Sequence, residues 1–143
     1  MVKIIRSYDF SASDFFDYIQ NSLTTEIKKA RNNNREVKIA DGTRYVLKGK
    51  DEHIFTKVKI NKFERNKVYS ATFTSLGETI TVTYLVTNQD KGCKITLTEQ
   101  VESYDPSTHN KLVNFFYDFM YHRSAQEELN KLALGVEKYK EKR

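Results

Sequence analysis

Cysteine is almost missing from this sequence, and long apolar runs are missing altogether. The 143 residues include one cysteine, Cys93, so no disulfide can form within the chain and no cysteine cluster is available for zinc. We therefore expect a reducing, cytoplasmic location. No apolar run approaches the ~18 residues of a membrane span, and the amino terminus lacks the apolar region and cleavage site of a signal peptide. Secretion and membrane insertion are both disfavoured.

Sequence motifs for common catalytic and metal chemistry are also missing. The chain has no glycine-rich phosphate loop, no zinc signature and no nucleophile elbow. His53 is expected in a turn, and His109 and His122 would lie about 220° apart around a continuous helix, so they cannot share a metal there. Cys93 has no nearby histidine in sequence to act as its base. We therefore predict no catalytic residue, no metal site and no cofactor.

The composition suits one soluble globular domain over residues 1–143. With 38% hydrophobic and 30% charged residues, the chain can build a core without disulfides or metal. The net charge of +5 is uneven, because residues 28–67 hold thirteen Lys and Arg and five acidic residues, a net of +8. Such asymmetry is typical of a surface that binds nucleic acid, acidic protein or anionic lipid. The other interpretation is a solvated sheet face, which we favour because the basic residues are spaced singly, without interleaved exposed aromatics.

The amino-terminal part predicts a strand followed by a helix. Residues 2–10 are rich in β-forming side chains, and residues 13–31 have apolar side chains at helical spacing. Ser11 and Asp14 have the spacing of a capping box, and Ser13 is a second candidate N-cap. Basic residues at the helix end oppose the negative end of its dipole.

From residue 35 to 103 the pattern alternates with period two and turn residues recur, which predicts an antiparallel meander. Strands are expected at 36–40, 44–48, 55–63, 67–75, 78–87 and 93–102. Asp41-Gly42 predicts a hairpin between the first two, because glycine tolerates the positive φ of a primed turn. Together with residues 2–10, the sheet has about seven strands.

The alternation predicts which side chains share the inner, apolar face of this sheet. A tight turn at Gly77 predicts three inward cross-strand pairs: Tyr69 with Tyr84, Ala71 with Val82, and Phe73 with Ile80. Leu97 and Glu99 face the same side from the next strand. The outer face is rich in threonine, so it suits water, whereas the inner face needs a covering element.

The last third of the chain predicts that covering helix. Asp105-Pro106 is a favourable helix start, and a bulky apolar stripe follows it. A later apolar group, formed by Leu129, Leu132, Ala133 and Val136, is rotated by roughly a quarter to a third of a turn, so we predict a kink or break near Arg123. Residues 139–143 are expected to fray. The shifted group could protrude past the sheet and support a homodimer.

This order of elements resembles the helix-grip (SRPBCC) superfamily, which includes START domains, birch-pollen-allergen-like proteins and polyketide cyclases. The most specific local piece is residues 10–19, FSASDFFDYI, and the resemblance runs from residue 2 to about 139. The chain is similar to short bacterial members of unknown function. The resemblance implies an α+β fold in which a curved antiparallel sheet wraps around the carboxy-terminal helix. It also implies a cavity between them that holds a lipid, sterol, polyketide or other apolar ligand.

The predicted function is therefore non-enzymatic binding of a small apolar or amphipathic ligand, an argument from fold analogy. The candidate ligand-binding residues are Tyr69, Phe73, Val82, Tyr84, Leu97, Glu99, Leu112, Phe115, Phe116 and Phe119. Plain core packing is the alternative for the aromatic residues, since ligand pockets need roughly 300 Å³ or more of unfilled space.

Two other functions remain open at this stage. One is an interaction module that uses a basic convex sheet face against nucleic acid or an acidic protein. The other is a cyclase-like or hydrolase-like enzyme, with Glu99 and a tyrosine as proton-transfer groups. Glu99 is expected to find a polar partner inside the fold, or to lie at a cavity mouth or be turned outward by a bulge.

Overall fold

The computed structural model describes residues 2–49, 55–75, 77–103 and 125–142. The elements in chain order are β1 (Val2–Tyr8), α1 (Ala12–Arg31), β2 (Arg44–Lys48), β3 (Phe55–Glu64), β4 (Val68–Ser75), β5 (Glu78–Asn88), β6 (Cys93–Ser103) and α3 (Ala125–Lys142). Residues 104–124 lie outside the described part. The predicted start of the last helix, its stripe of Leu112, Phe115, Phe116, Phe119 and Met120, and the predicted break near Arg123 therefore lie there too.

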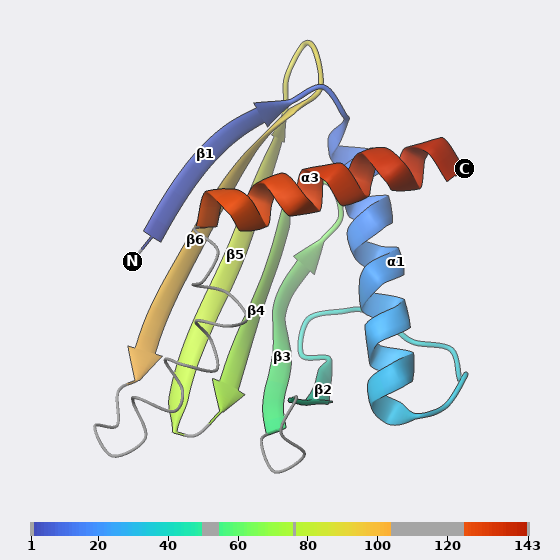
Figure 1. The fold of residues 1–143 in the computed structure, drawn as a ribbon, viewed down its shortest axis with the longest axis vertical. Helices are drawn as coiled ribbons and strands as arrows, with labels where there is room; N and C mark the ends of the chain where they lie inside the picture. The colour runs from blue at the N-terminus through green and yellow to red at the C-terminus, as the bar shows by residue number, and fades with distance from the viewer. Residues whose placement is uncertain (1, 50–54, 76, 104–124, 143) are drawn as a thin grey trace.

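The described strands form one antiparallel sheet that curves around the helices. Its strand order is β1-β6-β5-β4-β3-β2, so β1 is brought beside the last strand, and β2 is the opposite edge. Figure 1 shows α3 crossing the inner face of the sheet and α1 standing beside it, near β3 and β2. Both helices contribute to one buried apolar cluster with the inner face. This is the predicted α+β architecture.

The inner face of the sheet has the predicted register. Tyr69 pairs with Tyr84, Ala71 with Val82, and Phe73 with Ile80. On the outer face, hydroxyl side chains form hydrogen bonds across the same two strands: Ser70 with Thr83 at 2.9 Å, and Thr72 with Thr81 at 3.1 Å. Cross-strand hydroxyl pairs of this kind stabilise an antiparallel sheet on a wet face.

The start of α1 follows its predicted cap. Ser11 is the N-cap, and its Oγ accepts a hydrogen bond from the Asp14 amide at 3.0 Å. The Asp14 carboxylate accepts one in return from the Ser11 amide, also at 3.0 Å, which completes the capping box. At the other end, Asn32 closes the helix in the left-handed conformation with φ 53°. Both ends of α1 thus have partners for backbone groups that a helix leaves unsatisfied.

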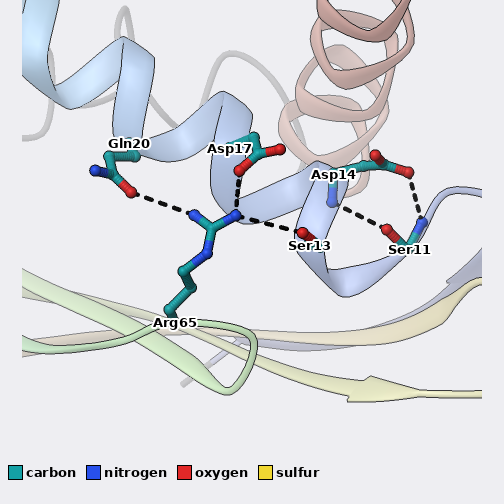
Figure 2. Close-up of polar contacts among 6 residues, drawn as sticks. All are labelled: Ser11, Ser13, Asp14, Asp17, Gln20 and Arg65. Carbon is teal, nitrogen blue, oxygen red and sulfur yellow. Dashed lines mark hydrogen bonds and ion pairs between the residues drawn. The ribbon is translucent and has the colours of Figure 1, made fainter.

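An arginine in the turn between β3 and β4 attaches α1 to the sheet. Arg65 forms an ion pair with Asp17 and donates hydrogen bonds to Gln20 at 3.2 Å and Ser13 at 3.3 Å. All three partners lie in the first half of α1 (Figure 2). Because the guanidinium presents several donors in one plane, a single side chain fixes one end of the helix against the turn.

The predicted strand at 36–40 is wrong, and the described sheet has six strands rather than about seven. This segment enters a turn instead: the Thr43 amide donates to the Ala40 carbonyl at 3.1 Å. The Gly42 amide donates to the Ile60 carbonyl at 2.7 Å, and the Phe63 amide donates to the Asp41 carboxylate at 2.8 Å. The turn thus bonds to β3 around the bulge between Ile60 and Lys62. Residues 36–40 have no strand partner among the described residues.

Two predictions about the terminal helix need correction. First, α3 continues to Lys142 and does not fray at 139, because Lys140 pairs with Asp14 at 3.5 Å and the Tyr139 ring packs against Tyr18. Second, the apolar group that was expected to protrude is covered. Leu129 and Val136 are completely buried. Leu132 and Ala133 are partly buried against the same core, and the homodimer stays a prediction.

Candidate functional site

A cavity of about 240 Å³ lies between α1, the inner face of the sheet and α3. Its wall is mostly apolar, with tyrosine rings, one serine and one glutamate as the polar elements. The lining residues are Ile19, Ser22, Leu23 and Glu26 of α1, Leu47 of β2, Tyr69, Ala71 and Phe73 of β4, Val82 and Tyr84 of β5, and Leu132 of α3.

The structure brings four of the predicted ligand-binding residues together on this wall: Tyr69, Phe73, Val82 and Tyr84. Two others are buried in β6 but are not part of the wall, namely Leu97 at 0% and Glu99 at 3% exposure. Leu112, Phe115, Phe116 and Phe119 lie outside the described residues. The cavity is therefore bounded by α1 as much as by the terminal helix, which the sequence patterns did not predict.

The two tyrosines on adjacent strands form the aromatic part of the wall. The rings of Tyr69 and Tyr84 stack with centroids 6.0 Å apart and only 3° between their planes. Phe15 of α1 packs on Tyr84 with centroids 5.9 Å apart, and Phe63 packs edge-on against Tyr69 at 6.2 Å. Rings held between other rings in this way keep their positions, so this side of the cavity is preformed.

The Glu26 carboxylate is held in the cavity wall by a tyrosine of the edge strand. Its Oε2 accepts a hydrogen bond from the Tyr45 hydroxyl at 2.6 Å. Burial raises the pKa of Tyr45 above its ordinary value, and the negative charge of Glu26 raises it further. The pKa of Tyr69 is raised for the same two reasons, burial first. Both phenols therefore remain protonated, and Tyr45 is the one that donates to the carboxylate.

Glu26 and Tyr45 were not among the predicted site residues, although the sequence contains a signal for each. Glu26 follows Ile19 by seven residues, two helical turns, so it shares the apolar face of α1. Tyr45 and Leu47 alternate with exposed residues in β2, so they face inward. A charged residue within an apolar stripe is the feature that marks Glu26.

Glu99 lies inward as the alternation predicted, but it is not among the residues that line the cavity. It pairs with Val82 of β5 on one side and Val2 of β1 on the other. It thus lies between β5 and the edge strand β1, at a position that does not contribute to the described wall of the cavity. The proton-transfer role considered for Glu99 and a wall tyrosine gains no support from this geometry.

Cys93 is a structural residue of β6. Its side chain is completely buried. Burial raises the pKa of its thiol to about 11, with a further contribution from the negative charge of Asp14. The thiol is therefore protonated at neutral pH, and it lacks the accessible thiolate that nucleophilic chemistry requires.

Neither a metal cluster nor a membrane-spanning helix is present in the described ranges of the chain. No group of three or more histidine, cysteine, aspartate or glutamate side chains is placed there to hold a metal ion. His53, His109 and His122 lie outside these ranges. Within the described part, no helix has both the length and the apolar character needed to cross a membrane.

Basic side chains gather on the outer face of the β2 edge, as the charge pattern predicted. Arg44 is directly opposite Lys59, and Lys48 is opposite Phe55. Two exposed apolar side chains lie among the cations: Val46 at 44% and Phe55 at 48% exposure. The expectation that no exposed aromatic accompanies the basic residues is thus wrong. We call this surface the basic edge; it consists of Arg44, Val46, Lys48, Phe55, Lys57 and Lys59.

The sheet, its strand order and the helix across its inner face define the helix-grip fold. Solved structures with this architecture include protein MLL2253 from Mesorhizobium loti, which has a TM-score of 0.61 and 16% identity, with 96% of each chain covered. The protein Ara h 8.0201 has a TM-score of 0.58 and 11% identity over 96% of this chain and 95% of its own. A protein of unknown function, SA2116 from Staphylococcus aureus, has a TM-score of 0.56 and 14% identity over 98% and 94%.

The chain belongs to a family described as a domain of unknown function, DUF3284, whose model matches residues 2–118. No curated protein matches the sequence. At identities of 11% to 16%, the solved structures show a common fold and nothing about a ligand.

Proposed function

We propose that this domain binds a small, mostly apolar ligand in the cavity between α1, β4, β5 and α3. The observation that carries the proposal is the 240 Å³ of unfilled space with a mostly apolar wall. Protein interiors are packed closely, so space of this size is unusual in a core that serves stability alone. Filling it would bury apolar surface of both ligand and wall.

The volume limits the size of the ligand. An engineered apolar cavity of about 150 Å³ accommodates benzene, so 240 Å³ has room for roughly ten non-hydrogen atoms. This is below the usual range for drug-sized ligands, which starts at about 300 Å³. A small aromatic or branched aliphatic molecule is therefore a better match than a sterol or a long acyl chain.

The proposal can be tested by titrating indole and p-xylene into isotope-labelled protein and following backbone amide resonances. We expect saturable shifts that are largest at residues of the wall, namely Ala71, Phe73, Val82 and Leu132. Native mass spectrometry of gently purified protein would show whether a ligand is retained from the cell. If neither probe produces saturable shifts, or if the shifts map to the outer face, the proposed function is wrong.

A second candidate function is binding of single-stranded nucleic acid at the basic edge. The observation that favours it is the exposed Phe55 ring among cations, with Lys57 beside it on the same face of β3. Backbone phosphates suit the cations, and a base can stack on an exposed ring. In the described residues, Lys57, Lys59 and Arg44 have no ion-pair partner, unlike Lys62, which pairs with Asp41 at 3.4 Å.

This second candidate is tested by binding of a labelled single-stranded oligonucleotide at several salt concentrations. Release of counterions predicts that affinity falls steeply as salt rises. The double variant Lys57→Glu/Lys59→Glu and the single variant Phe55→Ala should both weaken binding. Lys91→Glu changes one exposed charge in the turn between β5 and β6 and should leave affinity nearly unchanged. Equal binding by all variants, or no binding at low salt, would show that the basic edge is only a solvated surface.

A further inference from the structure

We infer that the ligand of this cavity is an amine, with a protonated nitrogen against the Glu26 carboxylate and an apolar body between the tyrosine pair and Leu132. This inference rests on the proposed function, because it assumes that the cavity is a binding site. It adds the chemical class of the ligand.

The charge of the wall is the first argument. Among the described lining residues, Glu26 is the only ionisable carboxylate, and none of them is a lysine, arginine or histidine. A ligand that fills the space removes water from the carboxylate, which is costly unless the ligand supplies a compensating group. A cation supplies both opposite charge and a hydrogen-bond donor, whereas an anionic ligand would add repulsion to that cost.

The geometry of the carboxylate is the second argument. Tyr45 donates to Oε2 at 2.6 Å and fixes the group in place. No other hydrogen bond or ion pair to Glu26 is present among the described residues, so Oε1 has acceptor capacity toward a ligand. The Tyr45 hydroxyl is a donor and leaves the negative charge on Glu26. The charge is therefore held in place, and no cation among the described residues forms an ion pair with it.

The shape of the wall is the third argument. Apart from Glu26, Ser22 and the tyrosine hydroxyls, the described lining residues have apolar side chains, which come from α1, the sheet and α3. Phe73 and Val82 come from the sheet, and Leu132 comes from α3. A compact amine with an aromatic or branched body can place its nitrogen at α1 and its body against these side chains. A polyamine would leave charges in apolar surroundings.

The test compares three probes of matched size: 2-phenylethylamine, which is cationic at neutral pH, 2-phenylethanol, which is neutral, and phenylacetate, which is anionic. Their dissociation constants are measured by amide shifts in the wild-type protein. We expect the amine to bind about tenfold or more tightly than the alcohol, since hydrogen bonds to charged groups are the stronger kind. We expect no saturable binding of phenylacetate.

Two variants then assign the preference to Glu26. Glu26→Gln keeps the size of the side chain and an oxygen that accepts from Tyr45, but removes the charge. It should lower the affinity for the amine to about that of the alcohol and leave the alcohol unchanged. Glu141→Gln removes the same charge from an exposed position near the end of α3 and should leave all three affinities unchanged.

The outcomes separate this inference from the proposed function. The amine assignment is wrong if the alcohol binds as tightly as the amine, or if Glu26→Gln leaves the affinity for the amine unchanged. In either case the cavity remains a binding site. If none of the probes binds and indole and p-xylene also fail, the proposed function itself is wrong. Even if Glu26→Gln does not fold, the affinities of the three probes for the wild-type protein decide whether the cavity prefers an amine.

Discussion

At the scale of single residues, buried tyrosine hydroxyls couple the stability of this fold to alkaline pH. Burial and the charge of Glu26 raise the pKa of Tyr45 and Tyr69 above the ordinary value of about 10. A phenol with a higher pKa in the folded state contributes stability that is fully present below about pH 10. That contribution is lost as the pH rises past the pKa of the unfolded state.

We therefore predict that the free energy of unfolding falls between pH 9 and 11, and that Tyr45→Phe makes the fall less steep. Urea unfolding of wild type and Tyr45→Phe at a series of pH values measures the free energy of unfolding of each. Absorbance of the phenolate form provides a second measurement. Below the pH of unfolding, the titration curves of wild type and Tyr45→Phe should coincide, because Tyr45 does not ionise in the folded wild type and is absent from the variant. A missing ionisation near pH 10 in the variant would contradict the prediction.

Gly92 is required in the turn between β5 and β6 for two reasons, conformation and space. Its φ is +84°, and a Cβ atom there would overlap the carbonyl of Tyr8 at the end of β1. Gly42 has a similar φ of +89° but no atom within 4 Å of a built Cβ. Gly42→Ala should therefore cost only the conformational penalty, about 1–2 kcal/mol. Gly92→Ala should cost clearly more, because β1 must also move.

Urea unfolding of these two variants beside the wild type tests the difference. Equal losses of unfolding free energy would show that the overlap with Tyr8 is relieved at no cost. In that case the contact between the turn and β1 would be adaptable.

At the scale of elements, α1 is fixed to the sheet by its apolar face and by one exposed arginine. We predict that Arg65→Ala lowers the free energy of unfolding by about 1 kcal/mol, because it loses the partners Asp17, Gln20 and Ser13 together. Arg65→Lys should recover only part of this, since an ammonium group lacks the planar fork. Chemical denaturation measures each loss.

Lys67→Ala is the matched control for Arg65. Lys67 lies in the same turn region, and among the described residues its one ion-pair partner is Glu64, at 3.3 Å, with 73% of the Lys67 side chain exposed. Lys67→Ala should change the free energy of unfolding by no more than about 0.5 kcal/mol. A loss as large as that of Arg65→Ala would indicate that the turn, and not the attachment to α1, accounts for the effect.

Local sequence patterns predicted most of the individual strands and the start of α1. The strands with clear alternation were predicted to within a residue or two, because a half-exposed strand must place every second side chain in the core. The capping box of α1 was likewise predicted from Ser11 and Asp14. The prediction of a strand at 36–40 was wrong. The alternation of this segment matches a strand, but the neighbouring turn takes the hydrogen bonds of β3. Competition for a strand partner is a tertiary effect.

At the scale of the whole molecule, the candidate site could be predicted only in part. Alternation placed Tyr69, Phe73, Val82 and Tyr84 on the inner face, and they line the cavity. The presence of Glu26 in the wall depends on how α1 turns toward the sheet, which Arg65 and the core decide together. The volume of the cavity depends on how closely the layers pack, and no sequence pattern measures unfilled space.

The two faces of the sheet therefore support different expectations for substitutions at neighbouring positions. Ala71 is buried on the inner face and lines the cavity, so Ala71→Leu fills part of the space with apolar atoms. We predict that it weakens binding of indole and p-xylene at least about tenfold. The free energy of unfolding should stay within about 1.5 kcal/mol of wild type, because the added atoms enter a void and do not overpack a dense core.

Thr81→Leu adds comparable apolar volume on the outer face of β5, where the native hydroxyl bonds to Thr72. It should leave probe affinity unchanged, because the sheet separates it from the cavity. Amide shift titrations and urea unfolding of both variants make the comparison. If Ala71→Leu keeps full affinity while it folds normally, the probes bind elsewhere. If it instead unfolds the domain, the space beneath α3 is already filled in solution, and the sheet has one wet face and one plain core.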